Sequence, residues 1–192
     1  MTRRVWWWLG ALVLAAGLGL VAWSVWPSRD RAGDSAQLPA DDELRRLVRT
    51  RAKELGELRE LIETEPRLTI IGDDRVEGCW RDRSGRWGCP DEKNLDESTM
   101  IDHVGLSRER WSRYRALLGA VGGHRVEREA AGRVRVMIFS AGIVTSGTGK
   151  DLVWSAAPPA PLVPDTDRDR SAHYTVNYAD AGDGWYIEHS SN

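Results

Sequence analysis

The chain has 192 residues, of which 29% are charged, and it contains ten tryptophans. Acidic and basic residues nearly balance, giving a formal net charge of -2, so the composition does not indicate a nucleic-acid partner. About 150 residues follow the hydrophobic N-terminal segment and its linker, which is enough for one domain with its own core.

The first predicted element is a membrane-spanning helix over Val5–Trp26, a segment without a charged residue. Its 22 residues can cross about 30 Å of hydrocarbon at a rise of 1.5 Å per residue. Tryptophans lie at both ends, as expected for indole rings between lipid and water. We therefore expect a cytoplasmic tail (1–4), a helix in contact with membrane lipid, a polar linker (27–40) and a soluble domain (41–192).

Cleavage of this segment as a secretory signal is the alternative. A signal has a shorter apolar region, of about 7–15 residues, and ends at a small-x-small site. Ala32 and Ala36 do not complete such a site, because Asp30 and Asp34 stand two residues before them. No cysteine follows the segment closely enough for a lipoprotein signal, so a retained helix is the preferred reading.

The flanking arginines do not settle the orientation of this helix. Arg3 and Arg4 favour a cytoplasmic tail, whereas Arg29 and Arg31 on the other side oppose it. The compartment of the domain must therefore be judged from other residues.

Two cysteines, Cys79 and Cys89, each follow a glycine, and Ser84–Gly85 lies midway between them. Two short strands joined at that turn would bring the sulfur atoms together in a disulfide worth about 2–3 kcal/mol. Zinc, which needs two further ligands, and two free thiols are the alternatives. A disulfide favours an oxidising compartment, so we expect the domain in the periplasm, anchored in a bacterial inner membrane.

The domain begins with a helix predicted over residues 41–63, capped by Asp41 or Asp42. Its apolar positions alternate in spacings of three and four, as in a heptad seam. We expect this seam to pack on the domain's own sheet, and dimerisation through helix 41–63 is the alternative. The seam residues are Leu44, Val48, Arg51, Leu55, Leu58 and Ile62.

The remaining segments predict one further helix and several antiparallel strands, and hence an α+β fold with two helices on a sheet of about five to seven strands. Turn residues separate these segments. In order they are a strand at 68–71, the cysteine hairpin, a polar loop at 91–99, a helix at 107–121, a strand at 134–140, a hairpin of 143–146 and 151–155 around Gly147–Gly149, a proline-rich segment at 158–164, and a hairpin of 174–178 and 185–189.

Two segments resemble ligand-binding motifs but lack their defining residues. Gly147–Lys150 would be the end of a phosphate loop, but Val144 and Asp151 stand where glycine and Ser or Thr are required. Residues 165–176 alternate aspartates like a calcium loop, yet the sixth position is Arg and the twelfth is Val. We therefore expect no cofactor and assign no catalytic residue.

Residues 68–189 resemble a family of small, uncharacterised bacterial envelope proteins. The matching segments are Gly105–Tyr114, the apolar strand with its glycine-rich hairpin, Pro158–Val163, and Tyr178 followed by Trp185–Tyr186. The resemblance implies the same α+β order of elements and brings no known activity. Many members look like lipoproteins, whereas this chain lacks the lipid-bearing cysteine and would use its helix instead.

These observations predict an anchored periplasmic domain that binds a protein partner, for example as an immunity-like protein. The candidate binding surface consists of aromatic residues, namely Trp80, Trp87, Tyr178, Trp185 and Tyr186. The alternative is a hydrolytic or metal-dependent enzyme that uses His173 and His189, which the last hairpin would bring together.

Overall fold

The computed structural model describes residues 38–143, 146–168 and 175–191. The predicted membrane helix Val5–Trp26, the tail before it and most of the linker lie outside the described residues. Within the described ranges, no helix has the length and apolar character needed to cross a membrane.

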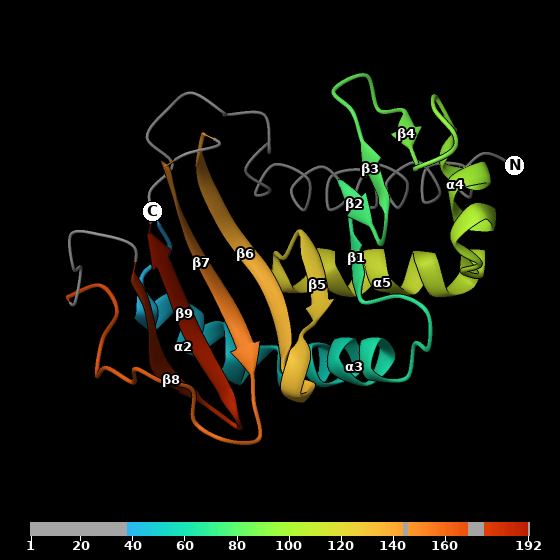
Figure 1. Ribbon diagram of the computed structural model, residues 1–192. Coiled ribbons are helices and arrows are strands. Elements are labelled where there is room, and N and C mark those ends of the chain that lie inside the picture. The colour runs from blue at the N-terminus through green and yellow to red at the C-terminus, as the bar shows by residue number, and fades with distance from the viewer. Residues whose placement is uncertain (1–37, 144–145, 169–174, 192) are drawn as a thin grey trace, which may run out of the picture. The chain divides into compact units, whose positions relative to one another are not determined.

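One antiparallel sheet forms the framework of the domain (Figure 1). Its order is β4-β3-β2-β1-β5-β6-β7-β9-β8, so short strands occupy one end and long strands the other. The strands are β1 (Ile70–Gly72), β2 (Arg75–Val76), β3 (Cys79–Arg81), β4 (Trp87–Gly88), β5 (Arg125–Arg128), β6 (Val134–Ile143), β7 (Ser146–Trp154), β8 (Thr175–Gly182) and β9 (Trp185–Ser191).

Helices pack along one face of this sheet. The first, α2, contacts β8 and β9, α3 contacts β5 and β6, and α5 contacts β1 and α3. Side-chain oxygens of Asp96 and Ser107 cap α4 and α5, and Gly105 and Gly122 end them with positive φ. The helices are α2 (Asp41–Thr50), α3 (Ala52–Glu63), α4 (Glu97–Val104) and α5 (Arg108–Val121), with a short 3₁₀ turn at Ala130–Gly132.

A single row of apolar side chains crosses eight strands on the helix-covered face. The register places these residues opposite one another from strand to strand, and all are buried. Together with the helices they form the continuous core of the domain. The row consists of Cys79, Val76, Ile71, Val126, Val136, Leu152, Ile187 and Ala179.

The predicted helix over 41–63 is two helices that meet at Arg51, whose φ of -122° and ψ of 25° interrupt the helical path. Its apolar seam is buried in the domain's own core, as expected. Dimerisation through helix 41–63 would need an exposed apolar seam, and within the described residues of α2 and α3 the apolar seam is buried. The buried seam residues are Leu44, Val48, Leu55, Leu58 and Ile62.

The α+β class is confirmed, but three details of the prediction need correction. The described residues contain four α-helices and nine strands, against the two helices and five to seven strands expected. The loop predicted at 91–99 runs into α4, and β2 and β5 are too short and too polar to show a clear alternation. Gly147–Gly149 lies inside β7, where Gly149 pairs with Ser140, so it is not a turn.

The outer edge of β8 is partly covered by the proline-rich segment. The backbone N–H of Tyr178 donates to the Pro161 carbonyl, and the N–H of Val163 donates to the Tyr178 carbonyl. Two residues farther along β8, the Arg45 guanidinium donates to the carbonyl of Asp180, and it also donates to the carbonyl of Pro164. Backbone groups that a further strand would use are therefore already paired at these positions.

Candidate functional site

The cysteine hairpin, residues 79–89, consists of β3, β4 and the turn between them. Trp80 pairs with Gly88 in the ladder, so Cys79 and Cys89 occupy the next opposed position, with Cα atoms 4.2 Å apart. The predicted disulfide between them is confirmed. The Cys sulfurs and a ring nitrogen of His103 lie within 4.8 Å of one another, but the sulfurs are bonded to each other and do not act as thiolate ligands.

The two faces of the cysteine hairpin differ in what they contact. Trp87 is buried, and its ring meets that of Trp111 edge to face at a centroid distance of 6.2 Å. Trp80 points the other way and is 50% exposed. Its ring lies close over Gly88, where a built Cβ would come within 3.2 Å of it. The missing side chain at Gly88 thus makes room for the half-exposed indole.

The tip of the cysteine hairpin is held by Asp82. Its carboxylate accepts hydrogen bonds from the Ser84 hydroxyl at 2.7 Å, the Ser84 N–H at 2.8 Å and the Arg86 N–H at 3.0 Å. These bonds, led by that from the Ser84 hydroxyl, lower the pKa of Asp82. All three bonds reach Oδ1, so this oxygen of the only carboxylate in residues 79–89 holds the turn.

The predicted aromatic surface needs correction, because three of its five members are buried. Trp87, Tyr178 and Trp185 are at most 6% exposed. Each of the three lies within a strand, in β4, β8 and β9 respectively, and its side chain is packed inside the domain. Tyr186 is half-buried, and Trp80 alone of the five is exposed.

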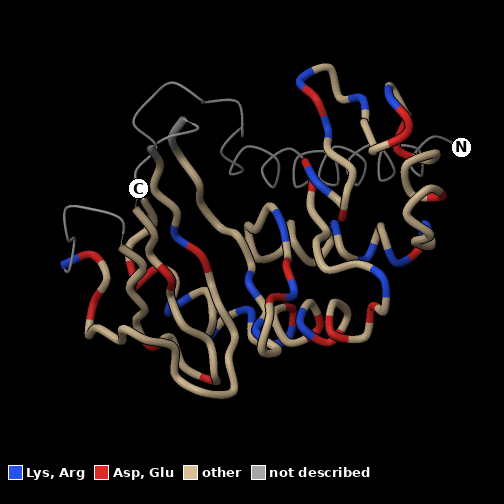
Figure 2. Tube along the Cα trace, viewed as in Figure 1, with Lys and Arg blue, Asp and Glu red and all other residues tan. Residues whose placement is uncertain are grey.

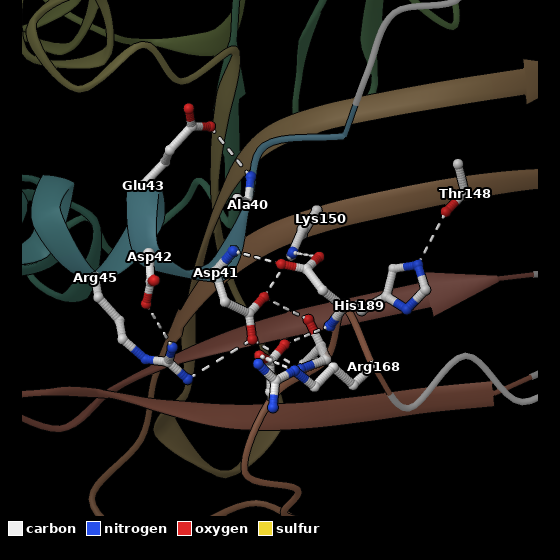
Figure 3. Close-up of polar contacts among 12 residues, drawn as sticks. Ala40, Asp41, Asp42, Glu43, Arg45, Thr148, Lys150, Arg168 and His189 are labelled. Atoms are coloured by element: carbon white, nitrogen blue, oxygen red, sulfur yellow. Dashed lines mark hydrogen bonds and ion pairs between the residues drawn. The ribbon is translucent and has the colours of Figure 1, made fainter.

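A second polar region lies where α2 begins, around the ammonium group of Lys150 (Figure 3). The Lys150 side chain points from β7 toward the helices and is 1% exposed. Its Nζ lies 2.5 Å from Asp41 Oδ1 and 2.6 Å from Asp167 Oδ1. A buried ammonium is stable only with such partners, and here two carboxylates supply the countercharge.

Asp41 connects this ion cluster to the loop before residue 169. Its carboxylate accepts hydrogen bonds from both the N–H and the hydroxyl of Thr166, at 2.7 and 2.6 Å. Its own N–H donates to Asp167. Carboxylate oxygens of Asp41, Asp165 and Asp167 come within 4.8 Å of one another, the spacing of a metal site. The Lys150 ammonium bridges two of these carboxylates and fits the set as its cation.

Of the two candidate histidines, only His189 lies among the described residues; His173 lies outside them. His189 stands in β9 opposite Lys150, is 7% exposed, and contacts the Thr148 hydroxyl through Nε2 at 3.2 Å. The described half of this candidate site is thus a buried histidine in hydrogen-bond contact with a threonine hydroxyl.

A third polar region occupies the opposite face of the sheet, around Arg135 on β6. Its guanidinium lies 2.9 Å from Glu188 Oε1, 2.8 Å from Glu129 Oε1 and 4.0 Å from Asp151 Oδ2. Asp151 and Glu188 are cross-strand neighbours, and both are nearly inaccessible. The other Asp151 oxygen accepts from the N–H of Ile138, the residue that bulges from β6.

Burial raises the pKa of Asp151 from its ordinary 3.8 to about 7. Arg135 and the Ile138 N–H oppose this shift, whereas the nearby charges of Glu188 and Glu127 add to it. A carboxyl group that titrates near neutrality is typical of functional sites and also of buried ion networks. Here the bonds to the bulge and to Arg135 give it a structural role.

Reasoning from the sequence missed both ion clusters. Lys150 and Asp151 follow each other, so in a strand they must point to opposite faces, each toward partners distant in sequence. The available signal was a pair of charged residues adjoining the apolar run Leu152–Trp154. A surface groove elsewhere, between α3 and Arg110 of α5, contains none of the predicted site residues.

Comparisons of the chain with family models, curated proteins and solved structures found no match. The resemblance to small envelope proteins therefore stays a prediction.

Replacing Lys150 with Met is expected to destabilise the domain by about 3–5 kcal/mol, because Asp41 would keep a buried charge without a cation. Urea unfolding followed by tryptophan fluorescence measures the loss. The double variant Lys150→Met/Asp41→Asn should lose less than the single variant, since one uncompensated charge is removed with its partner. Equal losses would show that the ion pair does not determine the effect.

Because the pKa of Asp151 is raised in the folded domain, we expect the free energy of unfolding to fall as pH rises. Between pH 4 and 7 the unfolded chain has released this proton and the folded chain still holds it, so stability declines by up to about 1.4 kcal/mol per pH unit and levels off above pH 7. Asp151→Asn, which can still accept from Ile138, should flatten this part of the profile. Chemical unfolding at a series of pH values tests it. The exposed-loop variant Asp91→Asn should keep the wild-type slope.

Proposed function

We propose that this chain is a single-pass protein of a bacterial inner membrane whose periplasmic domain binds a protein partner through Trp80. The observation that carries the proposal is the geometry of the cysteine hairpin. A large aromatic ring is half exposed, and the residue beneath it is a glycine, on which the ring lies closely. A disulfide closes the strands that carry it.

The energetics of binding support a rigid tryptophan as the main contact. Tryptophan is enriched among the few residues that dominate protein–protein affinity. Ordering a mobile side chain at an interface costs about 0.5–1.5 kcal/mol, and a ring already seated on Gly88 avoids part of this cost. The inward face of the same hairpin is fixed by the Trp87–Trp111 contact, so the whole element is presented as a unit.

The disulfide also supports the proposed compartment. Disulfides persist in exported domains and are rare in the cytoplasm, so the Cys79–Cys89 bond favours the periplasmic side of the membrane. The uncharged segment Val5–Trp26 would supply the anchor. An immunity-like role, in which the domain neutralises a partner in the envelope, is one form of this proposal.

The enzyme alternative receives less support from the geometry. His189 is buried beside Thr148, and the buried carboxylates of Asp151 and Glu188 lie within an ion network around Arg135. A substrate needs access to the reacting groups, and these side chains are at most 7% exposed.

If the domain is exported, the cysteines should be oxidised in growing cells. Cells are quenched in acid, free thiols are blocked under denaturing conditions, and the protein is then reduced and labelled with a polyethylene-glycol maleimide. A gel shift by two labels is expected for the wild-type chain. The Cys79→Ser variant, whose remaining thiol is blocked, should not shift. An unshifted wild-type band would argue for a reducing compartment and against the proposed location.

Partner binding at Trp80 is testable with a photo-crosslinking amino acid placed at that position in living cells. Leu162 is a matched control, because it is also 50% exposed and lies beside β8 at the other end of the sheet order. One discrete adduct to a single envelope protein is expected from position 80 and not from position 162. Adducts of equal yield from both positions, or none from position 80, would contradict the proposal.

A further inference from the structure

Lys150 carries a primary amine, a group that can attack a carboxyl carbon and form an amide. Charged residues are sparse on the long strands β6 to β9 (Figure 2), and Lys150 is the only lysine among them. Figure 3 shows its side chain directed at Asp41. The Lys150 Nζ lies 2.5 Å from Asp41 Oδ1, and the two side chains are 1% and 2% exposed. A nucleophile and a carboxyl group are thus held in contact away from water.

The amine of Lys150 is close to the carbon that it would attack. A carboxyl C–O bond is about 1.2 Å long, so Asp41 Cγ lies within about 3.7 Å of the Lys150 Nζ. Reacting atoms held about 3–3.5 Å apart are typical of conformers poised for reaction, and such placement raises their effective concentration by many orders of magnitude. A small movement of the lysine side chain therefore brings the nitrogen to the carbon.

The two oxygens of Asp41 have partners that suit two different roles. Oδ2 accepts from the Thr166 N–H at 2.7 Å and lies 3.7 Å from Arg45 Nη2. These donors would stabilise the negative charge that develops on an oxygen when an amine attacks its carbon. Oδ1 faces the amine and accepts from the Thr166 hydroxyl at 2.6 Å. Oδ1 is therefore the oxygen placed to leave as water.

Asp167 is placed to accept a proton from the amine. Its Oδ1 lies 2.6 Å from the Lys150 Nζ, and its Oδ2 accepts from the Asp41 N–H at 2.9 Å. This carboxylate thus contacts both reacting residues, as a general base must. Its side chain is 30% exposed, so it lies on the solvent side of the cluster, where protons and water can leave.

We propose that Lys150 and Asp41 join in a spontaneous isopeptide bond, for which the ion cluster is the starting state. The Nζ bonds to Asp41 Cγ, and the Cγ–Oδ1 bond breaks with its electron pair leaving on Oδ1. The ammonium gives up two of its three protons, one of them through Asp167. Oδ1 receives both protons and departs as water. Asp167 returns to its carboxylate form, and the step needs no oxidant, reductant or further reactant.

Burial favours the amide over the ion pair. Two buried charges carry a desolvation penalty that their attraction does not always offset, whereas an amide is neutral. The released water passes to solvent. Because the two reacting side chains are at most 2% exposed, little water reaches the bond to reverse the reaction.

The bond fixes the beginning of the domain to its sheet. Asp41 opens α2 and follows directly on the linker (27–40) that leads to the proposed anchor, and Lys150 lies in β7. Tension along the linker therefore acts on a covalent bond and is kept from the hydrogen bonds of α2. This inference does not depend on the partner proposed for Trp80.

The mass of the purified full chain tests the proposal. The chain is extracted in detergent micelles, unfolded and measured intact. We expect a mass lower by one water molecule than that of the sequence with its disulfide. Trypsin should release a branched peptide in which residues 32–45 are joined to residues 136–168, uncleaved after Lys150. The full mass, together with separate peptides ending at Arg45 and Lys150, would overturn the proposal.

Lys150→Arg is the matched control, because it keeps a cation between the two carboxylates and removes the primary amine. Its mass should show no loss of water. Asp183–Gly184 can lose water by a separate cyclisation, so a loss that persists in this variant would contradict the proposal. An amine reagent gives a second readout: in the unfolded wild-type chain it should label Lys53 and Lys93 but not Lys150.

Two variants of the acidic cluster test the role of Asp167. Asp167→Asn keeps an oxygen for the Asp41 N–H but is a poor proton acceptor, and should slow bond formation about 100-fold or more. Asp165→Asn makes the same change at a neighbouring carboxylate and should leave the chain fully bonded. The bonded fraction is measured by intact mass at intervals after induction, and tryptophan fluorescence confirms that both variants fold. Equal bonded fractions would remove Asp167 from the reaction, whereas the wild-type mass decides the bond itself without any variant.

Discussion

The ammonium group of Lys150 joins parts of the chain that lie more than a hundred residues apart. It comes from β7, among the long strands of the sheet, and meets Asp41 at the first turn of α2 and Asp167 in the loop that precedes β8. A buried ammonium needs paired carboxylates, so this requirement constrains the position of α2 over the long strands and the path of that loop. The apolar row beneath the helices then completes the core.

The short-stranded end of the sheet depends on different forces. Strands of two or three residues contribute few ladder bonds, so β2 to β4 could not persist on their own. The disulfide closes the hairpin, and the contact of Trp87 with Trp111 ties it to α5. This division leaves the outward face of the cysteine hairpin free of any packing role. Trp80 can therefore be half exposed there without cost to the core.

The sequence predicted those features that depend on neighbouring residues. Ser107 and Gly122 marked the ends of α5, the spacing of Cys79 and Cys89 around a turn indicated the disulfide, and seam spacing indicated the buried face of α2 and α3. Features that depend on distant partners were not predictable. Nothing near Lys150 in sequence indicates that Asp41 will neutralise it, and aromatic residues such as Trp185 look alike whether they end inside or outside the core.

The pairing of the proline-rich segment with β8 affects how readily copies of the domain associate through the edge of the sheet. If the proposed anchor holds the domain at a membrane, its copies meet more often than in free solution, and an open sheet edge would let one copy add to the next without limit. Residues 161–163 occupy the backbone groups of Tyr178, and Arg45 occupies the carbonyl of Asp180. These contacts limit edge-to-edge self-association at β8, and the contact surface proposed at the cysteine hairpin lies at the other end of the strand order.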